Sequence, residues 1–237
     1  MPIYDPRRKV GRLPTTFRRG VDSKGRPQSE IMERYWGWPI EFTKFTKIRR
    51  TFQRIFGKDD FLLKRFDATG KKQILLDWGC GGGAMVREAT SFYGNRATVL
   101  GYSVDSYKEW DKIKNVKFIQ CDSNDLDRYL RLGNIRPDCI VSHLGLSHLL
   151  GESDKPKHMA QLEKFRKLYE CMQDGGVMAF NIPNARIRNF LLRLTSWIKP
   201  VGYLWTEETL MGQFKELLPD AKISLERRVV YIKKPER

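Results

Sequence analysis

The fold of this 237-residue chain is decided by one stretch, Ile74-Leu75-Leu76-Asp77-Trp78-Gly79-Cys80-Gly81-Gly82-Gly83-Ala84. The apolar run Ile74–Leu76 predicts a buried strand, the four glycines predict a tight turn, and Met85–Phe92 predicts a helix. Glycine allows a sharp turn and lets a ligand approach the backbone without meeting a Cβ. The stretch therefore predicts the strand, turn and helix that open a nucleotide-binding α/β unit.

Asp77 narrows the class of ligand that this turn would bind. The spacing Gly79-x-Gly81-x-x-Ala84 also fits a dinucleotide fingerprint, which alone is a weak signal. A carboxylate two residues before the first glycine would repel a dianionic pyrophosphate. S-adenosylmethionine has no phosphate and carries an ammonium and a sulfonium, which a carboxylate attracts. Asp77 therefore disfavours a nicotinamide enzyme.

The string Leu76-Asp77-Trp78-Gly79-Cys80-Gly81-Gly82-Gly83 resembles the first motif (D-x-G-x-G-x-G) of class I S-adenosylmethionine-dependent methyltransferases. The resemblance is fairly specific for the cofactor and uninformative about the substrate, and the alternative is a glycine-rich turn of an unrelated α/β protein. It implies S-adenosyl-L-methionine as the cofactor, with its methionine part held by this loop. The cofactor-binding residues it implies here are Asp77, Trp78, Gly79, Cys80, Gly81 and Gly83.

From Gln73 onward, predicted strands and helices alternate, which indicates a mostly parallel sheet. The later predicted strands are Ala97–Val104, Val116–Gln120, Pro137–Ser142 and Val177–Ile182, followed by a hairpin of Lys222–Leu225 and Val229–Lys233. The predicted helices after the first are Tyr107–Ile113, Asn124–Leu132, His158–Met172 and Thr206–Leu218. This order resembles the class I methyltransferase fold, which implies a doubly wound, mostly parallel seven-stranded α/β sheet with a C-terminal antiparallel hairpin.

Three regions are predicted along the chain. Residues 1–28 mix prolines and glycines with Arg and Lys and predict a basic irregular arm, which either contacts phosphates or is a solvated tail. Residues 29–72 predict a helical N-terminal extension that ends with a helix over Asp59–Phe66. Residues 73–237 predict the methyltransferase domain, in which 184–204 is a substrate-side insertion.

The formal net charge of +16 favours an anionic partner, most often nucleic acid and sometimes a membrane surface. Most of the excess lies before the glycine turn, since residues 1–72 hold 19 Lys and Arg against 8 Asp and Glu.

The cysteines and the hydropathy indicate a cellular compartment. The four cysteines are widely spaced, which favours a reducing compartment over a disulfide framework. No apolar run approaches the ~18–20 residues of a membrane span. We therefore expect a soluble cytoplasmic protein, with the nucleus or an organelle as alternatives.

Further acids follow the next two predicted strands, and ligands of open α/β sheets bind at such carboxyl ends. The resemblance implies that Asp122, with Ser123, faces the adenine, and that an acid after the second strand takes the ribose hydroxyls. Asp105 fills this place if the strand runs two residues longer; otherwise Ser103 replaces the acid. Asp105 is equally well explained as a helix N-cap.

The fourth predicted strand leads into Ser142-His143-Leu144-Gly145-Leu146-Ser147-His148, the family's usual place for catalytic specialisation. The string lacks the motifs of base amino-nitrogen, cytosine-C5 and ribose 2′-O methyltransferases. It is more similar to small-molecule and cap guanine-N7 enzymes, which work mainly by alignment. His143, which would also border the cofactor, and His148 are candidate general bases, and the alternative for each is a hydrogen-bonded structural histidine.

The end of the fifth predicted strand should border the substrate. The candidate substrate-binding residues there are Asn181, Asn184, Arg186 and Arg188. The basic segment after Asn184 either grips phosphates or is a solvated face over an apolar stripe. His158 is predicted to lie on the surface, and no spacing of residues suggests a metal site.

The sequence as a whole predicts an S-adenosylmethionine-dependent methyltransferase that acts on RNA through its basic N-terminal region. One alternative is a catalytically inactive methyltransferase-like module that binds RNA or a ribonucleoprotein. Another is a methyltransferase for a small molecule or lipid.

Overall fold

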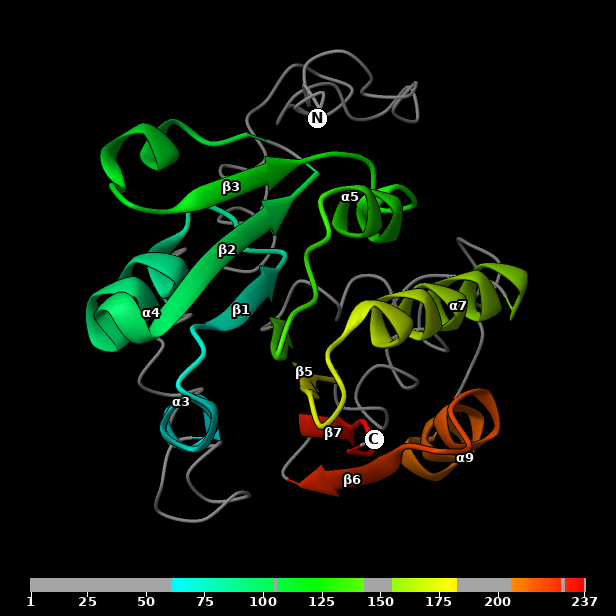
Figure 1. Cartoon of the computed structure of the whole chain (residues 1–237). Helices are drawn as coiled ribbons and strands as arrows, with labels where there is room; N and C mark the ends of the chain where they lie inside the picture. Colours follow the sequence, from blue (N-terminus) through cyan, green and yellow to red (C-terminus); the bar gives the residue numbers. More distant parts are fainter. Residues whose placement is uncertain (1–60, 105, 143–154, 183–205, 227–228, 237) are drawn as a thin grey trace, which may run out of the picture. The chain divides into compact units, whose positions relative to one another are not determined.

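The computed structural model describes residues 61–104, 106–142, 155–182, 206–226 and 229–236 (Figure 1). The chain divides between Asn134 and Ile135 into two compact units. The predicted arm, most of the predicted extension and the 184–204 insertion lie outside the described residues, so these domain assignments stay predictions.

The first unit is a three-stranded parallel sheet with helices between its strands. Its strands are β1 (Gln73–Trp78), β2 (Ala97–Ser103) and β3 (Lys117–Gln120), in the order β3-β2-β1. The helices described in it are α3 (Phe61–Thr69), α4 (Ala84–Tyr93), α5 (Leu126–Leu132) and the short 3₁₀ helices η2 (Gly94–Arg96) and η3 (Lys108–Lys112). The register pairs Asp77 with Gly101 and Trp78 with Tyr102, so the carboxyl ends of β1 and β2 lie side by side.

The core of the first unit explains why these segments fold as they do. Consecutive residues of β1, such as Leu75 and Leu76, are both buried, as is typical of a parallel strand covered on two faces. Helix α4 packs against β2 and buries Met85, Ala89 and Tyr93, which recur at helical spacing along one face. This packing fixes the start of α4 directly after the glycine turn.

Gln73 joins α3 to the first strand. The Arg65 side chain donates to Gln73 Oε1 over 3.2 Å, and Gln73 Nε2 donates to the carbonyl of Lys71 over 2.6 Å. Leu62 of α3 is buried. The described part of the predicted helix Asp59–Phe66 is α3, which ends at Thr69, three residues later than predicted. The contacts of Arg65 and Gln73 hold this last turn against β1.

The second unit combines a parallel pair with an antiparallel hairpin. Its strands, β4 (Cys139–Ser142), β5 (Val177–Asn181), β6 (Lys222–Glu226) and β7 (Val229–Lys233), follow the order β4-β5-β7-β6. The helices described in it are α7 (Lys155–Cys171) and α9 (Glu207–Leu217). Strands β4 and β5 are parallel, whereas β7 is antiparallel to both of its neighbours.

Three phenylalanines form the centre of the second unit. Phe165 of α7, Phe180 of β5 and Phe214 of α9 have ring centroids 4.5 to 5.5 Å apart. Aromatic rings at such distances contribute about 0.5–1.5 kcal/mol per pair beyond their burial. The two helices and the sheet of this unit therefore share one core.

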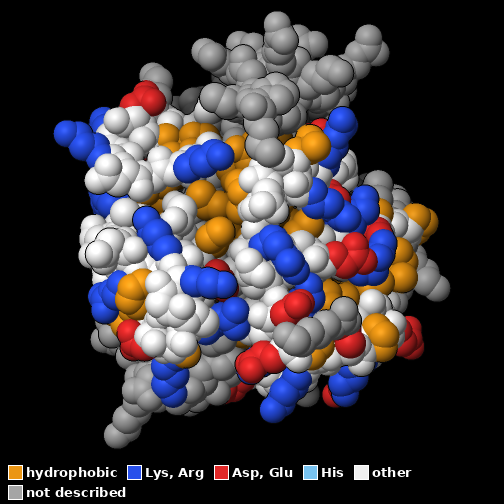
Figure 2. All heavy atoms as spheres, in the orientation of Figure 1, with side chains coloured by type: hydrophobic (Ala, Val, Ile, Leu, Met, Phe, Trp, Pro, Cys, Tyr) orange, Lys and Arg blue, Asp and Glu red, His pale blue; other side chains and the backbone are white. Residues whose placement is uncertain are grey.

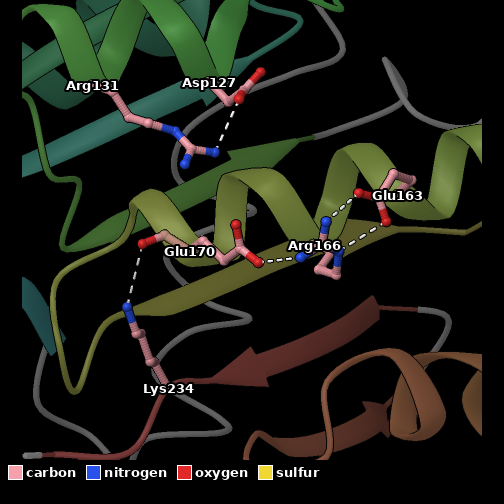
Figure 3. A network of polar contacts seen from close by, with 6 residues as sticks. All are labelled: Asp127, Arg131, Glu163, Arg166, Glu170 and Lys234. Carbon is pink, nitrogen blue, oxygen red and sulfur yellow. Dashed lines mark hydrogen bonds and ion pairs between the residues drawn. The ribbon is translucent and has the colours of Figure 1, made fainter.

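Polar contacts hold the ends of the two helices of the second unit. Thr206 caps α9, since its hydroxyl accepts from the amide of Thr209 over 3.1 Å. At the carboxyl end of α7, buried Lys234 donates to the carbonyl of Met172 over 2.9 Å and pairs with Asp174. Figure 3 shows Lys234 beside Glu170, whose side chain is bonded in turn to Arg166.

The described residues contain seven strands, three in the first unit and four in the second, and their order confirms the predicted α/β fold with its C-terminal antiparallel pair. Two predictions are wrong. The segment Tyr107–Ile113, predicted as an α-helix, instead forms the 3₁₀ helix η3 over five residues. Short segments of this kind often adopt 3₁₀ geometry. His158 is buried rather than on the surface, because α7 packs against α9 at this point. Its Nε2 forms a hydrogen bond with Gln213 Oε1 of α9 over 2.9 Å.

Candidate functional site

The glycine turn after β1 is held in one shape by its backbone. Gly79, Gly81 and Gly83 have φ angles of +90°, +51° and +83°, in the left-handed region that favours glycine. The amides of Gly79 and Cys80 both donate to the carbonyl of Tyr102 on β2, over 2.9 and 2.8 Å. The turn is therefore fastened to the neighbouring strand at its first two residues.

The glycines of this region serve different purposes. A Cβ on Gly83 would lie 2.9 Å from Phe118 Cζ, and one on Gly101 would lie 2.6 Å from Phe118 Cδ1. A Cβ on Gly81 would meet no described atom within 4 Å. Gly83 and Gly101 thus make room for the protein's own Phe118, and Gly81 presents the open backbone that a ligand can approach.

Asp77 is an isolated buried acid at the end of β1. It is 3% exposed, and among the described residues no hydrogen bond or ion pair reaches its carboxylate. Burial raises the pKa of Asp77 to about 8, since desolvation penalises the charged form. A buried carboxyl without a partner is unfavourable for folding, and a ligand that brings positive charge would supply the missing partner.

The cysteine of the turn is held in its neutral form. Burial, and then the charge of Asp77, raise the pKa of Cys80 far above its usual range, and its Sγ lies 3.6 Å from the carbonyl of Gly81. Burial likewise raises the pKa of Cys121 to about 12. Both side chains therefore remain neutral thiols at physiological pH.

Trp110 is a contact of the turn that the sequence did not reveal. Its indole N–H donates to the carbonyl of Gly81 over 2.8 Å from η3. Its ring stacks on Phe118, with centroids 4.5 Å apart and planes 6° apart. The hydrogen bond joins residues 29 positions apart, so only the folding of η3 against the sheet brings them together.

The ends of β2 and β3 carry the other predicted cofactor residues of the first unit. Strand β2 ends at the buried Ser103, so it does not run two residues longer, and Asp105 lies outside the described residues. Asp122 lies two residues after the end of β3 at Gln120. Its Oδ1 accepts a hydrogen bond from the amide of Asn124 over 2.8 Å. Ser123 is half-buried beside it. The parallel register thus brings Asp77, Ser103 and Asp122 to one edge of the sheet.

Little of the predicted substrate site falls on described residues. Asn181 is the last residue of β5, where its backbone pairs with Val229. Ser142, the last residue of β4, is 3% exposed, and its hydroxyl has no hydrogen-bond partner among the described residues. The remaining predicted residues, all outside the described part of the chain, are His143, His148, Asn184, Arg186 and Arg188.

A family model described as a methyltransferase domain matches residues 45–217, which is more than half of the chain. The chain belongs to the methyltransferase-domain family. This match confirms the predicted resemblance to the class I S-adenosylmethionine-dependent methyltransferases, whose cofactor is S-adenosylmethionine. No curated protein matches the chain.

Solved structures similar to this methyltransferase-domain protein share little sequence with it. The MycE methyltransferase from the mycinamycin biosynthetic pathway, in complex with Mg and SAH, is 18% identical with a TM-score of 0.47, over 88% of this chain and 48% of MycE. The aminoglycoside resistance methyltransferase NpmB1 is 14% identical with a TM-score of 0.47, over 70% of this chain and 89% of NpmB1. The chain thus spans about half the length of MycE and most of NpmB1.

A third similar structure is that of a single-residue mutant of the 16S rRNA (adenine(1408)-N(1))-methyltransferase from Catenulisporales acidiphilia. It is 12% identical with a TM-score of 0.43, over 75% of this chain and 92% of that one.

The residues of the turn fit the family's cofactor. Asp77 offers a buried carboxyl without a partner to a ligand that carries an ammonium and a sulfonium. At Gly81, no described atom lies within 4 Å of the place that a Cβ would take, so a ligand can approach the backbone from that side. Within the described residues, no group of three His, Cys, Asp or Glu side chains could hold a metal ion. Among the helices that the structure describes, none has both the length and the apolar composition that a membrane crossing requires.

Proposed function

We propose that this methyltransferase-domain protein is an active enzyme that transfers a methyl group from S-adenosylmethionine to RNA. The observation that carries the first half is the buried, unpartnered carboxyl of Asp77 beside the open backbone of Gly81. When bound, the cofactor would supply an electrophilic methyl group, whose bond to sulfur breaks as its bond to the acceptor forms, and S-adenosylhomocysteine would be the leaving group.

In this proposal Asp77 attracts the positive charge of the cofactor. A carboxyl that is already desolvated interacts strongly with a cation, because little water screens the pair. The attraction also favours the ionised acid, so cofactor binding would lower the pKa of Asp77 from its value of about 8. Asp122 and Ser123 remain candidates for the adenine, and Ser103 or Asp105 for the ribose.

Catalysis in this proposal depends mainly on alignment. The thiols of Cys80 and Cys121 are neutral, so neither serves as a covalent nucleophile. Aligning two reactants can contribute about 7–11 kcal/mol in favourable cases. His143 and His148 are candidate bases that matter only if the acceptor must lose a proton.

The RNA half of the proposal depends on charge. The chain has 44 Lys and Arg against 28 Asp and Glu, and the excess is concentrated before residue 73. On the described surface seen in Figure 2, Lys and Arg side chains are scattered among Asp and Glu side chains. Positive charge of this kind binds the phosphates of nucleic acid, and the basic residues near Arg186 and Arg188 would add contacts.

A second candidate function is an inactive module that binds RNA without transferring a methyl group. It is favoured by the neutral Ser103 at the end of β2, where an acid would bind the ribose more strongly. A methyltransferase for a small molecule or lipid is the third candidate, in which the charge serves localisation.

One experiment separates these functions. The full chain is incubated with total RNA and a cofactor labelled on its methyl group, and the RNA is then digested to nucleosides. We expect label in a methylated nucleoside, and none with an Asp77→Asn variant. Cofactor binding without labelled RNA would contradict the proposed substrate, and absence of cofactor binding would favour the inactive module.

A further inference from the structure

Trp110 forms the one described side-chain hydrogen bond from η3 to the open part of the glycine turn. The indole N–H of Trp110 lies 2.8 Å from the carbonyl oxygen of Gly81. A Cβ added to Gly81 would meet no described atom within 4 Å, so this side of the residue is open. Trp110 therefore acts on the part of the backbone that a ligand can approach.

The position of Trp110 is itself fixed by packing. Its ring stacks face to face on Phe118 of β3, and the Tyr107 ring lies 5.8 Å from it. Phe118 occupies the space that the missing side chains of Gly83 and Gly101 leave. The glycines, Phe118 and Trp110 thus form one packed stack that ends at the Gly81 carbonyl.

We propose that Trp110 is a positioning residue for the cofactor, because it holds the Gly81 peptide in the conformation that binds S-adenosylmethionine. The inference rests on the proposed function, in which this turn holds the cofactor. The amides of Gly79 and Cys80 fasten the turn to β2, and the amide of Gly83 closes it by donating to the carbonyl of Cys80 over 2.9 Å. Trp110 adds an N–H donor to the carbonyl of Gly81, which Cys80 Sγ approaches only to 3.6 Å, so the orientation of the Gly81 peptide depends in part on Trp110.

The expected effect follows from conformational populations. Without the indole hydrogen bond, the turn adopts the binding conformation for a smaller fraction of the time, and the apparent affinity falls by that fraction. A hydrogen bond between neutral groups contributes about 0.5–1.5 kcal/mol net. Its loss should therefore weaken cofactor binding about threefold to tenfold.

The test compares three variants by calorimetric titration with S-adenosylhomocysteine and with S-adenosylmethionine. Trp110→Phe removes the N–H and keeps an aromatic ring, and Phe118→Leu removes the stacking partner. Phe92→Leu is the matched control, because Phe92 packs on Tyr93 at the far end of α4. We expect a dissociation constant about threefold to tenfold higher for the first two variants and an unchanged one for the control.

A kinetic measurement distinguishes positioning from general stability. Trp110→Phe should raise the KM for the cofactor and leave kcat at saturating cofactor within about twofold, since only binding is lost. Trp110→Phe with the affinity of the wild type would overturn the proposal. If Trp110→Phe fails to fold, the dissociation constant of Phe118→Leu is compared with that of Phe92→Leu instead. Equal values for these two variants would also overturn the proposal.

Hydrogen exchange keeps this inference separate from the proposed function. In Trp110→Phe, the amides of residues 81–84 should exchange faster than in the wild type, with or without cofactor. A wild-type protein that binds no cofactor would refute the proposed function. Unchanged exchange in Trp110→Phe would refute the role of Trp110.

Discussion

Phe118 lies so close to Gly83 that a Cβ on the glycine would come within 2.9 Å of Phe118 Cζ. Ile113 is nearly as close, with its Cδ1 3.0 Å from the same position. The sequence motif alone assigns all its glycines to the ligand. The structure instead separates a glycine required by packing from one that faces open space.

The first prediction contrasts Gly83→Ala with Gly81→Val. Gly83→Ala should lower the melting temperature, because the new methyl group meets Phe118 at a φ of +83°. Gly81→Val should cost about 1–2 kcal/mol for its left-handed backbone, remain folded, and lose cofactor binding. Thermal unfolding and cofactor titration measure the two effects. Wild-type affinity in a folded Gly81→Val protein would remove the cofactor assignment of this turn.

The second prediction concerns the stability of the cofactor-free protein. The pKa of Asp77 rises from 3.8 in the unfolded chain to about 8 in the fold, so the folded state binds more protons between these values. The contribution of Asp77 to stability is therefore present below pH 4 and is lost as the pH rises toward 8. Asp77→Asn should stabilise the protein at pH 7, by an amount on the order of 4 kcal/mol at most.

Denaturant unfolding at pH 4 and pH 7 checks this prediction. The free-energy difference between Asp77→Asn and wild type should be larger at pH 7, because the asparagine does not titrate. A variant that is less stable than the wild type at pH 7 would show that Asp77 has a stabilising partner in the fold.

The third prediction is that cofactor binding releases a proton. Free Asp77 is mostly protonated below pH 8, and a cationic ligand favours its ionised form. Affinity should therefore rise between pH 6 and pH 8 and level off above, with at most a tenfold change per pH unit. Calorimetry in buffers of different ionisation enthalpy measures the released proton directly. Asp77→Asn is the control, and its weaker binding should lack this pH dependence.

The fourth prediction concerns residues 1–28. If this arm binds phosphates, its deletion should weaken RNA binding and flatten the salt dependence. Each lost phosphate contact should reduce the slope of log affinity against log salt by roughly 0.7–0.9. Electrophoretic shifts at several salt concentrations measure the slope, and an unchanged slope would identify the arm as a solvated tail.

The fifth prediction concerns the histidines after β4. If the acceptor is a ring nitrogen with a free lone pair, His143→Ala and His148→Ala should each change turnover only slightly at saturating cofactor. If the acceptor is a hydroxyl, the loss of a general base should slow turnover by about 10²–10⁴-fold. We expect the first result. A loss of a hundredfold or more in either folded variant would indicate an oxygen acceptor.

The fold of the described residues was largely predictable, because the strands are short apolar runs separated by strong turn signals. The hairpin strand Val229–Lys233 was predicted with its observed bounds. Strand β1 runs through Trp78 rather than ending at Leu76, since pairing with β2 continues to Tyr102. Such extensions depend on the neighbouring strand and leave no mark in the local sequence.

The site was predictable only in part. The position of Asp77 follows from its motif, but its isolation depends on burial by the surrounding core. The hydrogen bond of Trp110 to Gly81 joins distant segments, and no local pattern of residues encodes it. His158 was misplaced for the same reason, because its partner Gln213 lies on another helix.

The order of the strands in the second unit has a consequence for synthesis on the ribosome. Strand β5 pairs with β4 on one side and with β7 on the other, and residues 182–228 separate β5 from β7 in the chain. Until Val229–Lys233 has been translated and has left the exit tunnel, one edge of the apolar strand β5 has no partner. Nascent chains at that stage are therefore where we expect chaperones to bind.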